Sequence, residues 1–489
     1  SIFSLNSPIF TPFSLLVMRE YKKILSHFVK EHLLPLWRFR STDRLKSITV
    51  RIIDNYFFYV IGVFILIQII YAVFGQIPFQ SDSLRYYQQA VECIEKGTIY
   101  PGFHNLYDPY INAPIYVNFL IVVLSVFKSQ SIIPFVNIFL NTANLFLIFK
   151  ISCKIYNNLR ISKIAGLFYI FYLTNIGIVL LNLTELFYLF FTLLALYNYV
   201  GNKSYNFILA GLFVFLAMGV RQFGVLLLVS FLIYYGYLFY KRSSNPIETR
   251  KILFVSVSFV FFTFSYGLIN KLNSDVFLLT GTTGSINILM GANDFATGTY
   301  TNNFLSKGEL GYIDNEEFLT YSEKSGIWKD RAANWIIKNP FAWLKLLPKK
   351  IFHLFAYDDW SINTLLNTVD WNLPRIGKEI FVNDSWEIKK SDYSTTFWLL
   401  LTIVYFIHHL FYYSMFTIIL LYFLNVVRKK IKLNKCLEYI IIGYVIMGII
   451  ATIAAVGVSR YKYPYFIMLI IIISPFAYQL LVNDIKDNN

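Results

Sequence analysis

Charged residues are scarce in this chain: Asp, Glu, Lys and Arg together make up 15% of the 489 residues, whereas 56% are hydrophobic. Long apolar segments recur along almost the whole sequence, which excludes an ordinary soluble domain. Acidic residues are the scarcer kind, with 28 against 43 basic ones and a formal net charge of +15. The basic residues fall in short clusters between apolar segments, a pattern that positive-inside topology explains better than binding to nucleic acid.

Cysteine is also rare. Cys93, Cys153 and Cys436 lie far apart in the sequence, so neither a disulfide framework nor a zinc motif is expected. The N-terminus lacks the charged, hydrophobic and small-residue order of a cleaved signal peptide. Met18 is an alternative start to Ser1, with the preceding residues as an extension.

The hydrophobic pattern predicts an all-α polytopic membrane protein with about 10 to 11 transmembrane helices and an outward cap of loops and helices. A basic leader over residues 1–51 is expected on the cytoplasmic side, partly as an interfacial helix. Apolar segments then follow over 56–75, 113–127, 132–149, 164–181, 186–200, 207–218, 223–240, 253–269, 397–427, 439–458 and 463–481.

Three basic clusters, over 150–163, 241–251 and 428–435, are expected to face the cytoplasm. This sidedness puts a first loop, 76–112, and a long polar segment, 271–395, on the outer face. Seven apolar segments separate these two outward regions, although an even number of crossings is required. At about 1.5 Å per residue a 15-residue helix covers about 22 Å of the roughly 30 Å core. We therefore expect 113–127 to be a juxtamembrane or tilted helix, leaving about ten spans with both termini cytoplasmic.

The same pattern divides the chain after its leader. Residues 52–270 form an N-terminal transmembrane catalytic module, 271–395 a periplasmic cap, and 396–489 the C-terminal transmembrane helices. Within the cap a helix is expected near 323–337, ending at Asn339-Pro340. The next stretch, 340–356, has too many lysines to span a bilayer and too many large apolar groups to leave the surface, which predicts an interfacial helix.

Four charged residues lie at the outer edge of apolar segments: Asp82, Glu185, Arg221 and Arg460. An isolated Arg near the bilayer centre costs at least about 2.5 to 3.5 kcal/mol on insertion scales. Both arginines are therefore expected to meet an anion or an aqueous cavity. The alternative is that each one reaches lipid headgroups or pairs with a structural acid.

These groups could act on a lipid phosphate that carries a sugar. Arg221 and Arg460 would hold the phosphate in bidentate fashion, with Tyr461 and Lys462 as further donor-phosphate-binding residues. Asp82 would deprotonate an incoming hydroxyl or amine. Attack at an anomeric carbon passes through an oxocarbenium-like state, so a base on one face and a neutralised phosphate on the other predict a single displacement with inversion.

A series of short motifs follows along the chain: Asp82-Ser-Leu-Arg-Tyr-Tyr-Gln-Gln-Ala with Gly97, Thr184-Glu185, Arg221, Gly291-Ala-Asn-Asp, Asn339-Pro340 and Ser459-Arg-Tyr-Lys-Tyr-Pro464. This series resembles the GT-C membrane glycosyltransferases, and within them the bacterial relatives of dolichyl-phosphate-mannose protein mannosyltransferases and the lipid A aminoarabinose transferases. The resemblance implies a polyprenyl-phosphate sugar donor, catalysis on the outer face and Asp82 as the base.

The chain departs from that family pattern at one position. Many relatives carry Asp-Glu in the first loop, whereas Ser83 follows Asp82 here. Glu185 is the candidate substitute for the missing acid, and Tyr86 and Lys350 are further possible auxiliary residues.

No metal and no other cofactor are expected, because the chain lacks the Asp-x-Asp pair that binds a divalent cation in oligosaccharyltransferase-like members. Solvation is the expected role of the polar side chains in the first loop, namely Glu92, Glu95, His104 and Asp108. His408 and His409 fall inside an apolar segment, where a packed or neutral pair is expected rather than a proton relay.

The sequence thus predicts a glycosyltransferase of a bacterial inner membrane whose active site faces the periplasm. Its expected partners are the polyprenyl-phosphate sugar, membrane lipid, and an acceptor that is a glycan, a lipid or a protein. Two other readings stay open. One is a flippase or transporter of lipid-linked glycans, whose broken helices carry charges at mid-membrane. The other is an O-antigen-type polymerase or ligase.

Overall fold

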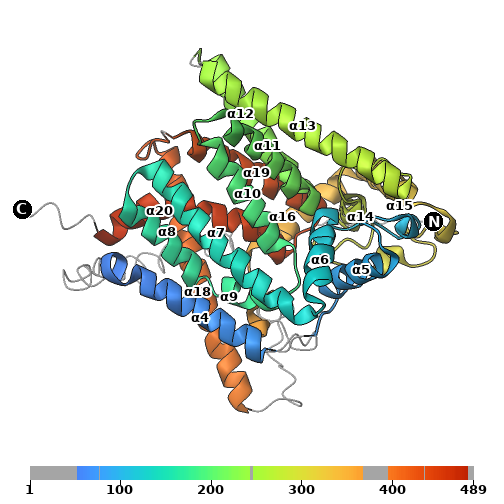
Figure 1. The fold of residues 1–489 in the computed structure, drawn as a ribbon, viewed down its shortest axis with the longest axis horizontal. Coiled ribbons are helices and arrows are strands. Elements are labelled where there is room, and N and C mark those ends of the chain that lie inside the picture. The colour runs from blue at the N-terminus through green and yellow to red at the C-terminus, as the bar shows by residue number, and fades with distance from the viewer. Residues whose placement is uncertain (1–51, 76–77, 243–245, 367–394, 434, 483–489) are drawn as a thin grey trace, which may run out of the picture. The chain divides into compact units, whose positions relative to one another are not determined.

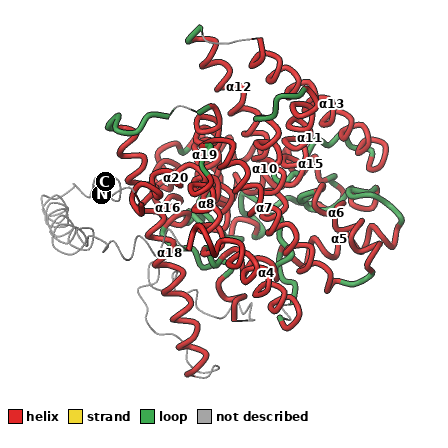
Figure 2. Tube along the Cα trace, turned by 60° about the vertical axis from the view of Figure 1, so that its left-hand side comes forward, coloured by secondary structure: helices red, strands yellow, loops and turns green. Residues whose placement is uncertain are grey.

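A computed structural model of the chain describes residues 52–75, 78–242, 246–366, 395–433 and 435–482, and the expected leader, 1–51, lies outside this range. Two compact units are distinguished. Of the first, which comprises 1–56 and 479–489, a π-helical turn over Ile52–Tyr56 and the last residues of helix α20 are described. The second unit comprises 57–478. Within the described residues the regular elements are helices and no strand is present (Figure 2).

Among the described residues seven helices are long and apolar enough to cross a membrane, which makes the chain a multi-pass membrane protein. An eighth crossing would be a broken one, Leu159–Phe171 with Thr174–Leu180, bent by 64°. The long helices are α4 (Phe57–Phe74), α7 (Ile133–Tyr156), α12 (Val225–Tyr240), α13 (Pro246–Ser274), α18 (Thr395–Val427), α19 (Cys436–Ala455) and α20 (Tyr463–Val482).

This count is lower than the ten to eleven spans expected from hydrophobicity, because some apolar helices are short. Helices α10 (Glu185–Tyr199) and α11 (Ser204–Val220) have 15 and 17 residues, which at about 1.5 Å per residue reach roughly 22 to 26 Å. Helix α6 (Pro114–Phe127) has 14 residues and, as expected, is shorter than a span. Figure 1 shows α10, α11 and α13 side by side, and α10 is buried along most of its length.

The first outward region, expected to be a loop, contains an amphipathic helix, α5 (Asp82–Lys96). Gly97 ends this helix with a φ of +65°, and its N–H bonds to the carbonyls of Cys93 and Ile94. Glycine suits this left-handed position because it has no Cβ. Helix α5 packs on α6, so Asp82 is held at the first turn of a fixed helix rather than on a free loop.

The cap contains α14 (Thr283–Met290), α15 (Tyr321–Lys338) and α16 (Pro340–Phe355). Thr320 and Glu323 form a capping box at the start of α15, satisfying the N–H groups that the first turn leaves free. Trp328 and Trp335 of α15 pack with Leu289 of α14 in one apolar core. Helices are therefore present at both expected positions, with the break at Asn339-Pro340, and the interfacial position of the second stays a prediction.

Candidate functional site

Two arginines and two acids from four distant segments meet in the second unit. Arg460 Nη2 lies 2.6 Å from Asp82 Oδ2, and Arg460 Nε lies 2.9 Å from Glu185 Oε1. Arg221 Nη2 contacts the same Glu185 oxygen at 2.5 Å. The Nε contact is an ion pair whose angle does not meet hydrogen-bond geometry. Glu185 thus sits between both guanidinium groups, and Asp82 pairs with one of them.

Helix ends place all four residues. Asp82 and Glu185 are the first residues of α5 and α10, where the helix dipole favours negative charge. Arg221 follows the last residue of α11 in an extended conformation. Arg460 lies in a four-residue 3-10 turn, Ser459–Lys462, that precedes α20. The cluster therefore stands where the helices end, not halfway along them.

The backbone around Arg221 needs a glycine. The turn Gln222–Gly224 folds back so closely that a Cβ on Gly224 would collide with the backbone of Ala217 and Met218. Arg221 Nε donates to Thr184 Oγ1 at 3.0 Å. Thr184 immediately precedes Glu185. One segment therefore supplies both the hydroxyl that accepts from this guanidinium and the carboxylate that balances its charge.

The cluster borders a cavity of about 760 Å³, within the size range of small-molecule sites. Asp82, Arg221 and Arg460 line it together with Tyr86 and Tyr461, whereas Glu185 is fully buried behind the arginines. The Tyr461 ring centre lies 5.5 Å from the Arg221 guanidinium and 5.8 Å from that of Arg460. Much of the remaining lining is apolar, including Leu181, Leu183, Phe223, Ile286, Met290, Trp343, Ala455 and Val458.

Two ionisable groups of α5 face this cavity in different protonation states. Burial alone would raise the pKa of Asp82, but the charge and hydrogen bond of Arg460 outweigh it and hold the pKa below its usual value. Burial raises the pKa of Tyr86, so its phenol stays protonated. Asp82 is therefore an anion that can accept a proton, while Tyr86 can donate a hydrogen bond.

Two predicted lysines lie away from the cavity lining. Lys462, expected to bind phosphate, is 1% exposed and its Nζ lies 3.0 Å from Asp358 Oδ1. Lys350, expected as an auxiliary residue, is buried and donates to the carbonyls of Gly291 and Ala454 at 2.9 and 3.2 Å. In a 3-10 turn successive side chains point about 120° apart. The Lys462 side chain can therefore point away from the cavity although Arg460, two residues earlier, lines it. Lys462 thus lies outside the cavity lining where a phosphate ligand is expected, and Lys350 lies outside it where an auxiliary residue is expected.

Burial lowers the pKa of Lys350 to about 8, which makes folding stability depend on pH. An unfolded lysine keeps its proton up to about pH 10.5. Between these values the unfolded chain binds more protons, so wild-type stability rises with pH through this window. We expect the melting temperature of the wild type, relative to Lys350→Met, to be higher at about pH 10 than at about pH 7. A constant difference would show that burial does not lower the pKa of Lys350 and that the folded chain keeps this proton up to about pH 10.

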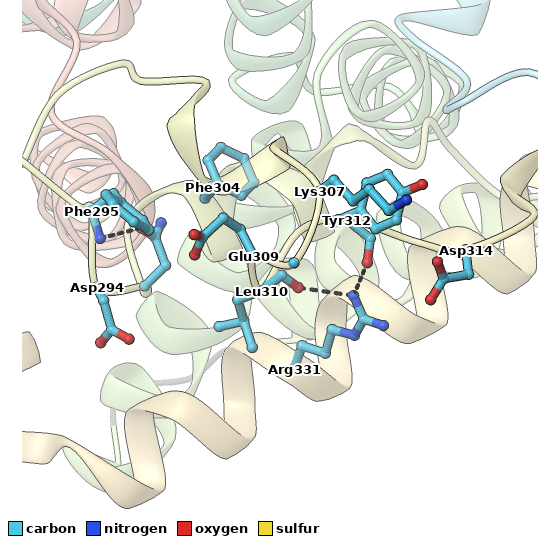
Figure 3. Close-up of a pocket in the computed structure, with 11 residues that line it drawn as sticks. Asp294, Phe295, Phe304, Lys307, Glu309, Leu310, Tyr312, Asp314 and Arg331 are labelled. Atoms are coloured by element: carbon cyan, nitrogen blue, oxygen red, sulfur yellow. Dashed lines mark hydrogen bonds between the residues drawn. The ribbon is translucent and has the colours of Figure 1, made fainter.

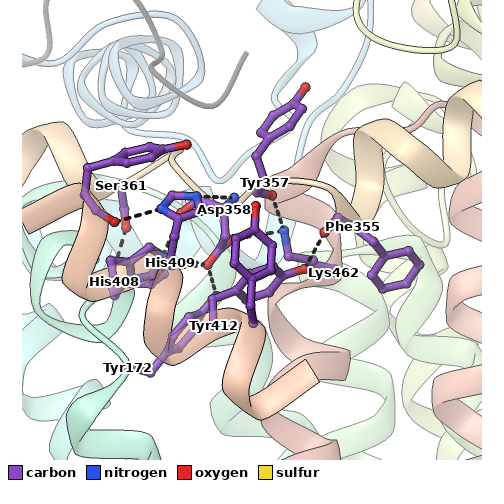
Figure 4. A network of polar contacts seen from close by, with 12 residues as sticks. Tyr172, Phe355, Tyr357, Asp358, Ser361, His408, His409, Tyr412 and Lys462 are labelled. Carbon is purple, nitrogen blue, oxygen red and sulfur yellow. Dashed lines mark hydrogen bonds and ion pairs between the residues drawn. The ribbon is translucent and has the colours of Figure 1, made fainter. Parts of the chain in front are cut away.

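Sequence reasoning missed Asp358. It is fully buried and accepts hydrogen bonds from the Tyr172 hydroxyl and from His408 Nε2, the latter at 3.2 Å (Figure 4). His409 accepts from the Asp358 N–H at 3.2 Å. The pair of histidines is packed, as expected, but against an acid 50 residues earlier. The sequence did contain a signal for this acid, because the Asp358-Asp-Trp motif follows the lysine-rich helix α16 after only two residues.

A second hollow, of about 570 Å³, lies in the cap around α15 (Figure 3). Arg331 lines it and donates to the carbonyls of Leu310 and Tyr312 at 2.9 and 2.5 Å. Asp294 accepts from the indole of Trp335 at 2.9 Å. Arg331 and Asp294 thus bond within the cap, and Lys307, Glu309 and Asp314 complete the charged lining of this hollow.

The expected solvation of the first-loop side chains agrees in part with their positions. Glu92 pairs with Lys96 at 2.6 Å, and both side chains are more than 40% exposed. His104 Nε2 lies 4.0 Å from the same Glu92 oxygen. Among the described residues no three His, Cys, Asp or Glu side chains are grouped as metal ligands. The absence of a cofactor stays a prediction.

Neither a protein-family model nor a curated protein matches the chain. A solved structure that it resembles is the archaeal oligosaccharyltransferase AglB from Archaeoglobus fulgidus in complex with an inhibitory peptide and a dolichol-phosphate. The sequence identity is 14% and the TM-score is 0.44. The match covers 90% of this chain and 53% of the other. This chain therefore spans about half the length of the protein it matches.

Proposed function

We propose that the chain is a GT-C-type membrane glycosyltransferase that moves a sugar from a polyprenyl-phosphate donor to an acceptor on the outer face of a bacterial inner membrane. One observation carries this proposal. Asp82, Arg221 and Arg460 converge on a cavity with a large apolar lining, in a chain whose described part has seven helices that can cross a membrane. A lipid phosphate needs both features, because its headgroup is an anion and its tail is apolar.

The arginines are suited to a departing phosphate. Each guanidinium presents its donors in a planar fork, and both arginines line the cavity. As the bond between the anomeric carbon and the phosphate oxygen breaks, the electron pair and negative charge pass to the phosphate. Arg221 and Arg460 would stabilise that charge, which is the electrostatic contribution that matters most in such a displacement.

Asp82 is suited to the opposite role. An acceptor hydroxyl or amine would attack the anomeric carbon from the face opposite the phosphate, and its proton would pass to the Asp82 carboxylate. The new bond forms as the phosphate bond breaks, so the anomeric configuration inverts. The Asp82 side chain is 34% exposed, which leaves it accessible from the cavity.

The position of the cluster favours an enzyme over a transporter. Asp82 lies on α5, which is not one of the membrane-spanning candidates, and Arg221 lies at the junction of two helices. A transporter would place its coupling charges near the bilayer midplane. Thr280 of the cap also donates to the carbonyl of Met218 at 2.8 Å, so cap residues complete the cavity next to Arg221.

Replacing Arg221 or Arg460 with lysine tests the phosphate role. Lysine keeps the charge but not the fork, so we expect polyprenyl phosphate to bind about tenfold more weakly to either variant, since a charge-assisted hydrogen bond contributes roughly 1.5 to 3 kcal/mol. Binding is measured with the purified full chain in detergent. Arg331→Lys, in the second hollow, is the matched control and should bind normally. Undiminished affinity of both cavity variants would refute the phosphate clamp.

A further inference from the structure

A buried ionic network lies behind the cavity wall. Its centre is the Asp358 carboxylate, which is fully buried and pairs with Lys462 Nζ at 3.0 Å. The Tyr172 hydroxyl donates to the other carboxylate oxygen, and His408 Nε2 lies 3.2 Å from that oxygen. Lys462 Nζ also donates to the carbonyl of Tyr357 at 2.7 Å. Figure 4 shows these side chains converging from separate helices and loops.

Two histidines of α18 bond to Asp358. His409 Nε2 accepts from the Asp358 N–H, and its Nδ1 donates to the Tyr405 carbonyl at 3.0 Å. His408 Nε2 lies 2.7 Å from the Asp358 carbonyl oxygen and 3.2 Å from its carboxylate. Lys462 Nζ, 3.0 Å from the other carboxylate oxygen, brings a positive charge to Asp358.

The ion pair joins two segments that both reach the cavity. Lys462 follows Arg460 by two positions in the turn Ser459–Lys462, and Trp360 follows Asp358 by two positions in the loop after α16. Arg460 and Trp360 line the cavity, whereas Asp358 and Lys462 do not. The ion pair thus links the turn that carries Arg460 to the loop that carries Trp360, and the link itself lies outside the cavity lining.

Desolvation makes such a pair a poor source of stability. Taking two charges out of water costs several kcal/mol for each ion, and replacing a buried pair by apolar groups is often neutral for folding. What a satisfied pair can supply is a single defined geometry. In this chain the pair would define the geometry of the four-residue turn that contains Arg460. The first and last residues of this turn, Ser459 and Lys462, are buried.

We infer that the Asp358–Lys462 pair positions Arg460 for donor-phosphate binding, and this inference rests on the proposed function. Asp358 and Lys462 are positioning residues, because they act on the substrate only through Arg460. Tyr172 supports them by donating to Asp358. Without the pair, the turn keeps its chain connectivity but loses the contact that fixes its direction, and a guanidinium displaced by about 1 Å can cost up to about a hundredfold in function.

A double variant tests this inference. Asp358→Asn with Lys462→Met removes both charges together and leaves no buried ion unpaired. We expect the double variant to keep a melting temperature near that of the wild type and to bind polyprenyl phosphate at least about tenfold more weakly. The matched control is Glu248→Gln with Lys251→Met, which removes an ion pair of 2.8 Å on α13. The control should bind like the wild type.

A double-mutant cycle separates positioning from general weakening of the fold. In an Arg460→Lys background, where the fork is already lost, adding the double variant should weaken binding by less than about twofold. An additive loss would overturn the inference, and so would equal binding by the folded double variant and the wild type. If the double variant does not fold, Tyr172→Phe replaces it, with about a threefold loss expected that again disappears in the Arg460→Lys background. Failure of the wild type itself to bind polyprenyl phosphate would instead refute the proposed function.

Discussion

Replacing Asp82 with asparagine is expected to abolish sugar transfer and, at the same time, to tighten the binding of polyprenyl phosphate. Transfer should fall by about 10² to 10⁴, the usual contribution of a general base. Binding should improve because Arg460 Nη2 now contacts Asp82 Oδ2 at 2.6 Å, a contact that an incoming phosphate must replace. The pair is partly exposed, so its attraction is roughly 1 kcal/mol, or about a fivefold gain in affinity.

Both effects can be measured on one preparation of the full chain. Transfer is followed with a labelled polyprenyl-phosphate sugar and acceptor, and affinity with polyprenyl phosphate alone. Asp108→Asn is the matched control, because Asp108 lies on the same segment, 76–112, but does not line the cavity. Unchanged transfer by Asp82→Asn would remove Asp82 as the base. Weaker binding would show that Asp82 helps to hold the donor and does not compete with it.

Glu185→Gln is expected to have the largest effect on folding. The Glu185 carboxylate is fully buried and contacts Arg221 and Arg460 at 2.5 and 2.9 Å. Removing its charge leaves two mostly buried guanidiniums without their shared counter-ion. Breaking a buried pair in this way typically lowers the free energy of unfolding by roughly 3 to 5 kcal/mol. We expect a clear drop in melting temperature.

An added anion should partly reverse this loss. Because the phosphate of the donor lipid can supply the missing negative charge, polyprenyl phosphate should raise the melting temperature of Glu185→Gln more than that of the wild type. Glu92→Gln is the control, since its ion pair with Lys96 is exposed and should contribute little. A melting temperature of Glu185→Gln equal to that of the wild type would show that Glu185 does not hold the arginines.

The sequence was sufficient to find the charged cluster. Asp82, Glu185, Arg221 and Arg460 each stand where an apolar segment ends, and positive-inside topology puts all four ends on one side. Charged side chains at one edge of an apolar bundle avoid lipid by pairing with one another or by facing an aqueous cavity. The convergence of these four residues could therefore be predicted without coordinates. Their pairing could not, because it depends on side-chain directions that sequence spacing does not fix.

Other features depend on packing at long range. The partner of Lys462 is Asp358, more than 100 residues earlier, and no local pattern in either segment identifies the other. Lys350 belongs to a helix that was predicted correctly, yet its side chain faces two carbonyls rather than solvent. The number of spans also differs because the expected count included the short segments 186–200 and 207–218, and the corresponding helices α10 and α11 have only 15 and 17 residues.

The most direct test of the central claim is a cryo-electron microscopy map of the full chain in lipid nanodiscs with polyprenyl phosphate. We expect phosphate density in the cavity of about 760 Å³, within hydrogen-bond distance of both Arg221 and Arg460, with Asp82 released from Arg460. Phosphate density at another site, or an Arg460 still paired with Asp82 while the lipid is bound, would contradict it.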